Sequence, residues 1–254
     1  RGRRAASLAI SGLVFLLLLA APAIGMRLGM PGARVVDEGR SSRDGYELLV
    51  ASFGPGAAAP LFVTTPTDQA PEVVALASAD RNVVDARVVA EPAASGRTVV
   101  RGTPATAVVA PETSDMVGRL RTTIGDTVPD AAVGGPAAQN HDLTAELIGR
   151  APIAIGIIML VAFVLLLVVF RSLTIALSSI FLNLLSVGAS FGFATLVFQH
   201  GFGASLIGIE HQGFVDAWAP LFFFALLFGL SMDYQLFLLA AIRERYEATG
   251  DTQL

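Results

Sequence analysis

Long apolar stretches alternate with charged ones along this chain and predict four membrane-spanning helices. No charged residue lies between Arg4 and Arg27, and twenty uncharged residues run from Ala151 to Phe170. At about 1.5 Å per residue, twenty helical residues cover roughly 30 Å, which is the thickness of the hydrocarbon layer of a bilayer. We therefore predict helices over about residues 6–26, 151–170, 173–198 and 218–242.

The first apolar stretch shares one feature with secretory signal peptides. Three arginines at positions 1, 3 and 4 precede it, as in the basic leader of such a peptide. Its apolar core is longer than the usual length of about 7–15 residues, and three further spans follow it. We interpret residues 1–26 as containing a true membrane helix.

The arginines of the short segments predict the orientation. Outside residues 27–150, arginine occurs only at positions 1, 3, 4, 171, 243 and 245, and the connection 199–217 has none. Short cytoplasmic segments are enriched in Arg and Lys. Both termini are therefore predicted to be cytoplasmic, with residues 247–254 as a tail.

Residues 27–150 are then an extracytoplasmic domain inserted between the first two spans, with 11 Arg and 15 Asp or Glu. Their pattern predicts an α+β domain of order β-α-β-β-α and a last strand near Val133, as in a split βαβ or ferredoxin-like sandwich. The expected helices are 42–52, 68–79 and 113–127, and the expected strands are 61–65, 83–89, 97–101 and 106–110.

The composition supports a membrane protein and excludes several site chemistries. Hydrophobic residues make up 54% of the chain and charged residues 15%, against about 25% charged in ordinary soluble domains. The mean hydropathy is +0.65. The chain has neither Cys nor Lys, which excludes disulfides, thiolate metal sites, a Walker A loop and a Schiff-base lysine. The net charge of −4 gives no support for a nucleic-acid partner.

Asp233 is the candidate for a proton-carrying group. It is the only charged residue between Asp216 and Arg243. Ten residues separate it from Arg243, so it lies about 15 Å along the helix from the cytoplasmic end, close to the bilayer centre. A carboxylate there costs at least about 2.5–3.5 kcal/mol, and burial favours its neutral form. We predict a proton relay with Tyr234 as the hydrogen-bonding companion; the alternative is an aspartate that only fixes helix packing.

The residues around this pair are expected to contact another helix. Adjacent helical residues do not face each other, so Asp233 and Tyr234 each need a partner elsewhere. Gly229, one turn before Asp233, would let such a helix approach closely. Ser231 adds a hydroxyl to the same segment.

The third predicted span carries polar residues at intervals of four, three and four, which place them on one helix face. They are Ser179, Asn183, Ser186 and Ser190. We interpret this stripe as interhelical hydrogen bonding. The alternative is the polar wall of a proton or substrate path.

Residues 188–192 have the form Gly-x-Ser-x-Gly of a hydrolase nucleophile motif. That motif requires a strand–turn–helix context, whereas these residues lie inside an apolar helix, where small residues four apart promote helix packing. We therefore predict packing and no enzyme. His141, His200 and His211 are far apart and show no metal-ligand spacing, so no metal site is predicted.

The segment around Asp233 resembles the MMPL family of RND-superfamily transporters. Residues 228–239 read Phe-Gly-Leu-Ser-Met-Asp-Tyr-Gln-Leu-Phe-Leu-Leu, and Ile-Arg-Glu-Arg-Tyr follows at 242–246. The segments 133–138 with Asp142, 170–173 and 182–189 resemble the same family. The resemblance is strong over 133–246 and weak over 27–110. Gln235 departs from the acidic residue often found at this position.

The resemblance implies a repeated transporter of twelve spans, in which this chain would be the seventh helix, the second periplasmic domain and helices eight to ten. Members of the family export lipids or other hydrophobic molecules across the bacterial inner membrane, driven by the proton gradient. Asp233 and Tyr234 match the family's Asp-Tyr pair, which interacts with a matching pair at the membrane centre. The resemblance thus implies protons as the coupling ion without another cofactor, a hydrophobic or lipid substrate among membrane lipids, and a homologous N-terminal half as partner, in the same chain or a separate one.

One alternative function remains open at this level. A non-transporting lipid-sensing or assembly membrane protein of the same architecture would use residues 27–150 to bind lipid or protein. A membrane enzyme would need a nucleophile and a base that the sequence does not bring together.

Overall fold

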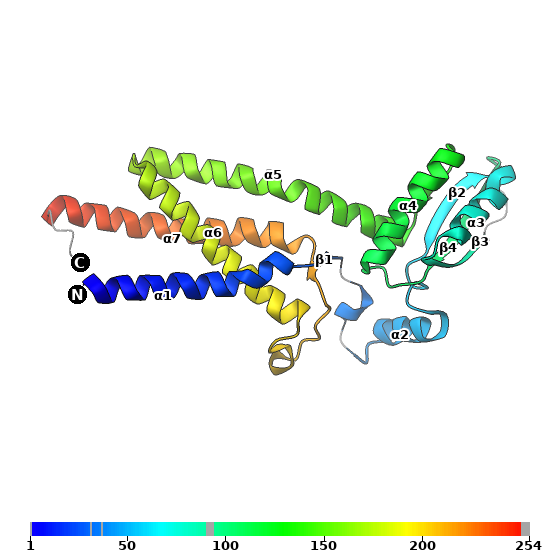
Figure 1. The fold of residues 1–254 in the computed structure, drawn as a ribbon, viewed down its shortest axis with the longest axis horizontal. Coiled ribbons are helices and arrows are strands. Elements are labelled where there is room, and N and C mark those ends of the chain that lie inside the picture. Colours follow the sequence, from blue (N-terminus) through cyan, green and yellow to red (C-terminus); the bar gives the residue numbers. More distant parts are fainter. Residues whose placement is uncertain (1, 31, 37, 90–93, 250–254) are drawn as a thin grey trace. The chain divides into compact units, whose positions relative to one another are not determined.

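The computed structural model describes residues 2–30, 32–36, 38–89 and 94–249 (Figure 1). The chain divides into two compact units. One is Gly29–Glu146, called here the α+β unit; the other combines Arg1–Leu28 with Leu147–Leu254 and is called the helical unit. The two units are described separately.

Four long helices confirm the predicted polytopic helical architecture. They are α1 (Gly2–Ala20), α5 (Pro136–Phe170), α6 (Leu173–Ala194) and α7 (Ala219–Thr249). The segments long and apolar enough to cross a membrane are Ala6–Gly25, Pro136–Phe170, Leu173–Gln199 and Ala219–Ile242. Charge-free runs predict these helices well because the hydrocarbon layer excludes charge over a fixed length.

The helix of the second span begins well before the apolar run from which it was predicted. Gly135 has φ 93°, a left-handed conformation that glycine adopts without strain, and Pro136 follows as the first residue of α5. Pro152 lies inside the helix. Because α5 runs from the α+β unit into the helical unit, the apolar pattern marks only its second half.

Helices α5, α6 and α7 of the helical unit pack through one apolar cluster. It consists of Ala162, Leu166 and Phe170 of α5, Ala176 and Val187 of α6, and Phe224, Phe228 and Met232 of α7. The rings of Phe224 and Phe228 are stacked with their centroids 5.2 Å apart. Many other apolar side chains on these helices are exposed, as expected for surfaces that face lipid or further helices.

Several short elements complete the helical unit. The 3₁₀ turns are η1 (Ala21–Gly25) and η5 (Ala204–Ile207), and α6 continues into a π-helical turn, η4 (Thr195–Gln199). The short strand β6 (Val215–Asp216) precedes α7, and β1 (Leu28–Gly29) lies where the two units join along the chain. The Val215 N–H donates to the Arg27 carbonyl over 2.8 Å.

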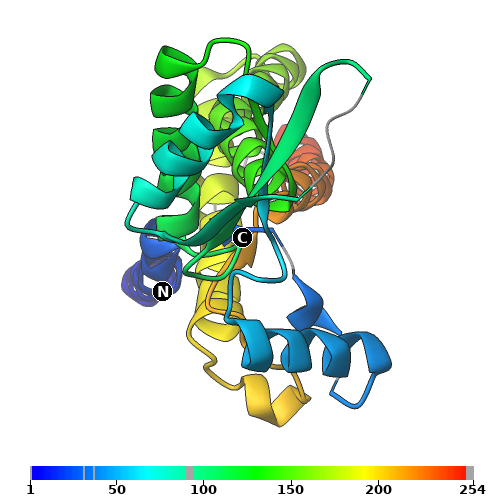
Figure 2. The same cartoon turned by 90° about the vertical axis from the view of Figure 1, so that its right-hand side faces the viewer.

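The α+β unit contains a four-stranded antiparallel sheet of order β3-β4-β2-β5 (Figure 2). Its elements follow the predicted sequence order, and their bounds are β2 (Leu61–Pro66), α3 (Ala70–Ala79), β3 (Val83–Val88), β4 (Arg97–Pro104), α4 (Pro111–Thr127) and β5 (Ala132–Gly134). The helix α2 (Ser41–Phe53) and the turns η2 (Ala33–Val35) and η3 (Thr67–Gln69) precede or join these elements.

Helices α3 and α4 cover one face of this sheet. Alternate residues of β2 and β4 are buried, which is the periodicity of strands with one face in a core. The core contains Leu61, Val63, Val73, Ala77, Val100, Met116, Val117, Leu120, Ile124 and Val128.

The expected strand over 106–110 is wrong. The strand β4 ends at Pro104, and turns follow. The Thr113 hydroxyl donates to the Ala107 carbonyl over 2.9 Å, and the hydroxyls of Thr106 and Thr113 lie 2.8 Å apart. These side-chain bonds stabilise a turn that leads into α4, a competition with strand pairing that is typical of Thr.

Candidate functional site

Asp233 and Tyr234 lie at the middle of α7, and both residues are exposed in the part of the chain that the structure describes. Tyr234 is 78% exposed. Within the part of the chain that the structure describes, neither side chain has a hydrogen-bond partner from another helix. The helix therefore presents both groups on a surface that is open in this chain.

The opposite face of α7 explains why Asp233 points away from the apolar cluster. Phe224, Phe228 and Met232 are spaced by four residues and are all buried. Such spacing defines one stripe of a helix. Asp233 follows Met232 directly and is therefore turned about 100° away from that stripe.

Asn183 provides a polar link between α6 and α7. Its side chain is 3% exposed, and its Nδ2 donates to the Phe228 carbonyl over 3.1 Å. The other amide atom, Oδ1, is buried without a partner among the described residues. The bond reaches α7 five residues before Asp233, so it lies just over one turn from the candidate relay.

The other members of the predicted polar stripe divide between two environments. Ser179 is buried like Asn183, whereas Ser186 and Ser190 are exposed. Ser186 donates to the Leu182 carbonyl and Ser190 to the Ser186 carbonyl, both over 3.0 Å and within their own helix. Among the residues that the structure describes, Asn183 is the member of the stripe that bonds to another helix.

Gly229 and Ser231 lie beside the candidate relay on α7. Gly229 is exposed, and a Cβ built on it would meet nothing within 4 Å among the described residues. Ser231 is half-buried. The approach to Gly229 is therefore open to a helix from outside this chain.

Gly188 and Gly192 pack α6 against α1, which confirms the packing interpretation of the Gly-x-Ser-x-Gly segment. A Cβ on Gly188 would lie 3.5 Å from Cβ of Ala20. A Cβ on Gly192 would overlap with the carbonyl oxygen of Leu19. Small residues four apart thus let the two backbones touch, as in membrane helix pairs of the small-xxx-small type.

The histidines occupy unrelated places. Nδ1 of His141 lies 2.6 Å from the Ser114 hydroxyl, in the α+β unit. The ring of His211 lies beside Gly201 in the loop between α6 and α7. Among the described residues, no group of three or more His, Cys, Asp or Glu is placed to hold a metal ion.

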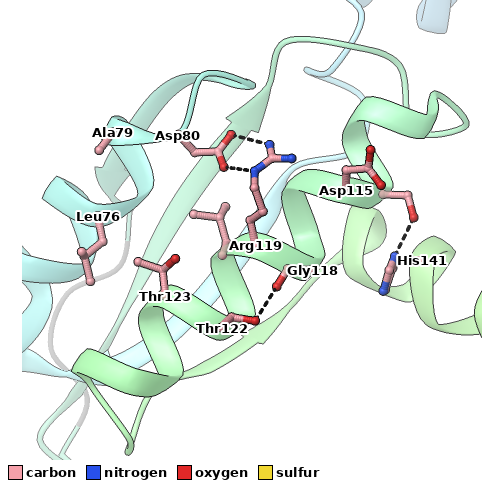
Figure 3. Close-up of a pocket in the computed structure, with 11 residues that line it drawn as sticks. Leu76, Ala79, Asp80, Asp115, Gly118, Arg119, Thr122, Thr123 and His141 are labelled. Atoms are coloured by element: carbon pink, nitrogen blue, oxygen red, sulfur yellow. Dashed lines mark hydrogen bonds and ion pairs between the residues drawn. The ribbon is translucent and has the colours of Figure 1, made fainter.

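The α+β unit has a shallow groove of about 720 Å³ between α3, α4 and the start of α5 (Figure 3). Asp80 and Arg119 form a two-bond ion pair at its edge, with both nitrogen–oxygen distances 2.9 Å. The hydrogen bond from Arg119 holds the pKa of Asp80 below its usual value. The sequence did not single out this pair, because its members lie 39 residues apart and only the packing of α4 beside the end of α3 joins them.

Comparison with known proteins supports the membrane-transport interpretation. The chain is 33% identical to the "Probable transport protein MmpL11" of Mycobacterium leprae over 94% of its own length. It is 32% identical over 99% of its length to the "Mycolic acid-containing lipids exporter MmpL11" of Mycolicibacterium smegmatis. It is 33% identical over 96% of its length to the "Heme uptake protein MmpL11" of Mycobacterium tuberculosis.

The chain spans only 25%, 28% and 27% of the length of these three relatives, in the same order. All three are described as proteins of transport, export or uptake, and four apolar helices of spanning length accompany the similarity. Residues 62–253 match the MMPL family. This match covers most of the chain and includes Asp233, and the chain therefore belongs to the MMPL family of membrane proteins.

Proposed function

We propose that this chain is part of a transporter that exports lipids or other hydrophobic molecules across the bacterial inner membrane, driven by the proton-motive force. The observation that carries the proposal is Asp233, a lone carboxyl group in an apolar helix of spanning length. Ionisable groups inside membrane helices commonly serve proton relays and transport pathways. Protons are the coupling ion in this proposal.

In the proposed mechanism, Asp233 takes up and releases the proton and Tyr234 is its hydrogen-bonding companion. Protonation removes the charge that favours water or a polar partner at this position. It thereby changes which packing of α7 against its neighbours is stable. The proton gradient biases this change in one direction across the membrane.

The partner for this face is the homologous half of the transporter, in the same polypeptide or a separate one. The exposed side chain of Tyr234 and the open space beside Gly229 support this assignment. A carboxyl group at the bilayer centre is unfavourable in contact with lipid, which favours an interhelical position. A matching Asp-Tyr pair on the partner would complete the polar contacts.

The α+β unit contributes to the substrate conduit in this proposal. We assign its β2-α3-β3-β4-α4-β5 order, with sheet order β3-β4-β2-β5, to the ferredoxin-like type. Residues 27–150 are extracytoplasmic and both termini cytoplasmic, because that arrangement puts the short-segment arginines inside.

The proposed cargo class is hydrophobic. One relative carries the name of an exporter of mycolic acid-containing lipids and another that of a heme uptake protein. Both cargoes have large apolar surfaces. The proposal therefore extends to hydrophobic molecules as a class.

Asp233→Asn tests the function in the complete protein, reconstituted in vesicles with an imposed proton gradient and a fluorescent long-chain lipid. We expect loss of gradient-dependent lipid movement with normal protein levels. Asp216→Asn is the matched control, because it makes the same chemical change outside the apolar segment of α7. Undiminished transport by Asp233→Asn would contradict the proposal and favour a lipid-sensing or assembly role.

A further inference from the structure

Two side-chain amides of the third span bond to the backbone of other segments. Asn183, near the middle of α6, donates to the Phe228 carbonyl of α7. Gln199, at the end of the π-helical turn η4, bonds to the segment that follows α1. All three bonds lie within the helical unit.

Gln199 holds the chain on both sides of Met26. Its Nε2 donates to the Gly25 carbonyl over 3.1 Å, and its Oε1 accepts from the Arg27 N–H over 2.7 Å. One amide thus satisfies two backbone groups of the segment that follows the end of α1. From Arg27 the chain continues directly into the α+β unit.

Between these two amides, α6 is packed closely against α1. The backbone of Gly192 touches that of Leu19, so relative movement of α1 and α6 is restricted there. Asn183 and Gln199 are sixteen residues apart, which corresponds to about 24 Å of helix. The continuous stretch of α6 and η4 therefore contacts α7 near Asp233 at one point and the Gly25–Arg27 segment, which precedes the α+β unit along the chain, at the other.

We propose that Asn183 and Gln199 are positioning residues through which α6 transmits a shift of α7 at Asp233 to the Gly25–Arg27 segment. This inference rests on the proposed function and adds the route by which a proton event at the bilayer centre reaches the extracytoplasmic domain. Asn183 ties the relay helix to α6, and Gln199 ties α6 to the segment from which that domain begins.

The chemistry of the two residues suits this role. Hydrogen bonds are directional, so a bond from a short side-chain amide restricts the sliding of one element along another more than apolar packing does. Asn183 uses its donor for this, and Gln199 uses both its donor and its acceptor. The turn η4, which continues α6, is π-helical, and such turns are frequent at functional sites. Ser178 offers a contrast on the same helix, because its hydroxyl bonds only the Ile175 carbonyl within α6.

Hydrogen exchange of the complete protein in lipid nanodiscs tests the route. Asp233→Asn serves as a mimic of the protonated carboxyl group at fixed pH, and exchange is followed in the peptide containing Gly25–Arg27. We expect the exchange rate there to differ about threefold or more between wild type and Asp233→Asn. In an Asn183→Leu background, and separately in a Gln199→Met background, that difference should disappear.

Ser178→Ala is the control background and should leave the difference intact. Gln199→Met also covers the case in which Asn183→Leu does not fold, because Gln199 lies at the end of the span. If Asp233→Asn does not change the exchange rate of this peptide in the otherwise wild-type protein, the inference is wrong. If it persists in both amide variants, the signal travels from α7 through Val215 to Arg27 instead, and the inference is also wrong.

The transport assay separates this inference from the proposed function. Loss of lipid movement in Asp233→Asn, with normal movement in Asn183→Leu and Gln199→Met, would overturn only the route through α6. Normal movement in Asp233→Asn would overturn the proposed function itself.

Discussion

Gly192 lies against the backbone of Leu19, so that α6 and α1 touch where a side chain would not fit. The two residues are more than 170 positions apart in the sequence. Their contact brings the first helix of the chain against the third span. Helices in lipid associate through such close packing, because apolar side chains gain little by leaving lipid for protein.

Gly192→Ala should destabilise the packing of α1 on α6. The new methyl group would overlap with the Leu19 carbonyl, and overpacking of this kind costs typically about 1–3 kcal/mol. Thermal denaturation in detergent, followed by size-exclusion chromatography, should show a lower transition temperature.

Gly156→Ala is the control for that change, since it makes the same substitution in another apolar helix. Among the described residues, a Cβ at Gly156 would meet nothing within 4 Å, and Ala favours helix by up to about 1 kcal/mol over Gly. This variant should be as stable as wild type or slightly more stable. Equal effects at Gly156 and Gly192 would contradict the close-packing explanation.

Asp80→Asn should destabilise the α+β unit at neutral pH by about 1–2 kcal/mol, because it breaks a charged pair with Arg119 in which the Asp80 side chain is only 9% exposed. The bond to Arg119 lowers the pKa of Asp80, so ionised Asp80 stabilises the folded state above its unfolded pKa of about 3.9. This stabilisation is lost as the pH falls through the lower folded pKa. We expect the α+β unit of the variant to unfold at a lower urea concentration than that of wild type at pH 7, and this gap should shrink at acidic pH. Limited proteolysis at each urea concentration reports the unfolding.

The matched control for Asp80 is Asp85→Asn. Asp85 faces Arg87 at 3.5 Å, but both side chains are about half exposed or more, and such pairs contribute little. We expect this variant to unfold at the same urea concentration as wild type. A loss at Asp80 that is unchanged at acidic pH would show that the ion pair is not its source.

Asp216→Asn should change stability in the opposite direction and make the folded state more stable at neutral pH. Burial raises the pKa of Asp216, which means that the folded state disfavours its ionised form. The penalty is present when the pH is above the folded pKa and disappears below the unfolded pKa. The variant should thus show a small rise in melting temperature at pH 7 and none near pH 3. A lower melting temperature at pH 7 would indicate that the ionised group has a stabilising partner.

Parts of the fold could be predicted from the sequence because the signal is local. Charge-free runs predicted the four long helices, and the strands expected over 61–65 and 97–101 are present as β2 and β4. The start of α5 at Pro136 was not predicted, because its first residues are polar on one side and belong to the α+β unit. The turn at 106–110 was mistaken for a strand, since the bonds from Thr113 that hold it are not visible in a hydrophobicity pattern.

The candidate relay could also be predicted only in part from the sequence. Asp233 stands out in the sequence because one charge in an apolar helix is energetically unfavourable wherever that helix packs. The sequence also placed Ser179, Asn183, Ser186 and Ser190 on one stripe. It could not show that Asn183 bonds to the Phe228 carbonyl while the last two serines bond within their own helix, because those partners depend on how α6 crosses α7.

The sequence by itself determined the membrane character, the four spans, the inserted α+β unit and the position of the lone carboxyl group. These properties follow from the free energy of transferring side chains between water and hydrocarbon, which acts residue by residue. Only the tertiary structure decided that Gly192 touches α1, that Asn183 and Gln199 bond to other segments, and that Asp80 pairs with Arg119. Such contacts join residues distant along the chain, and their geometry depends on the packing of whole helices and strands.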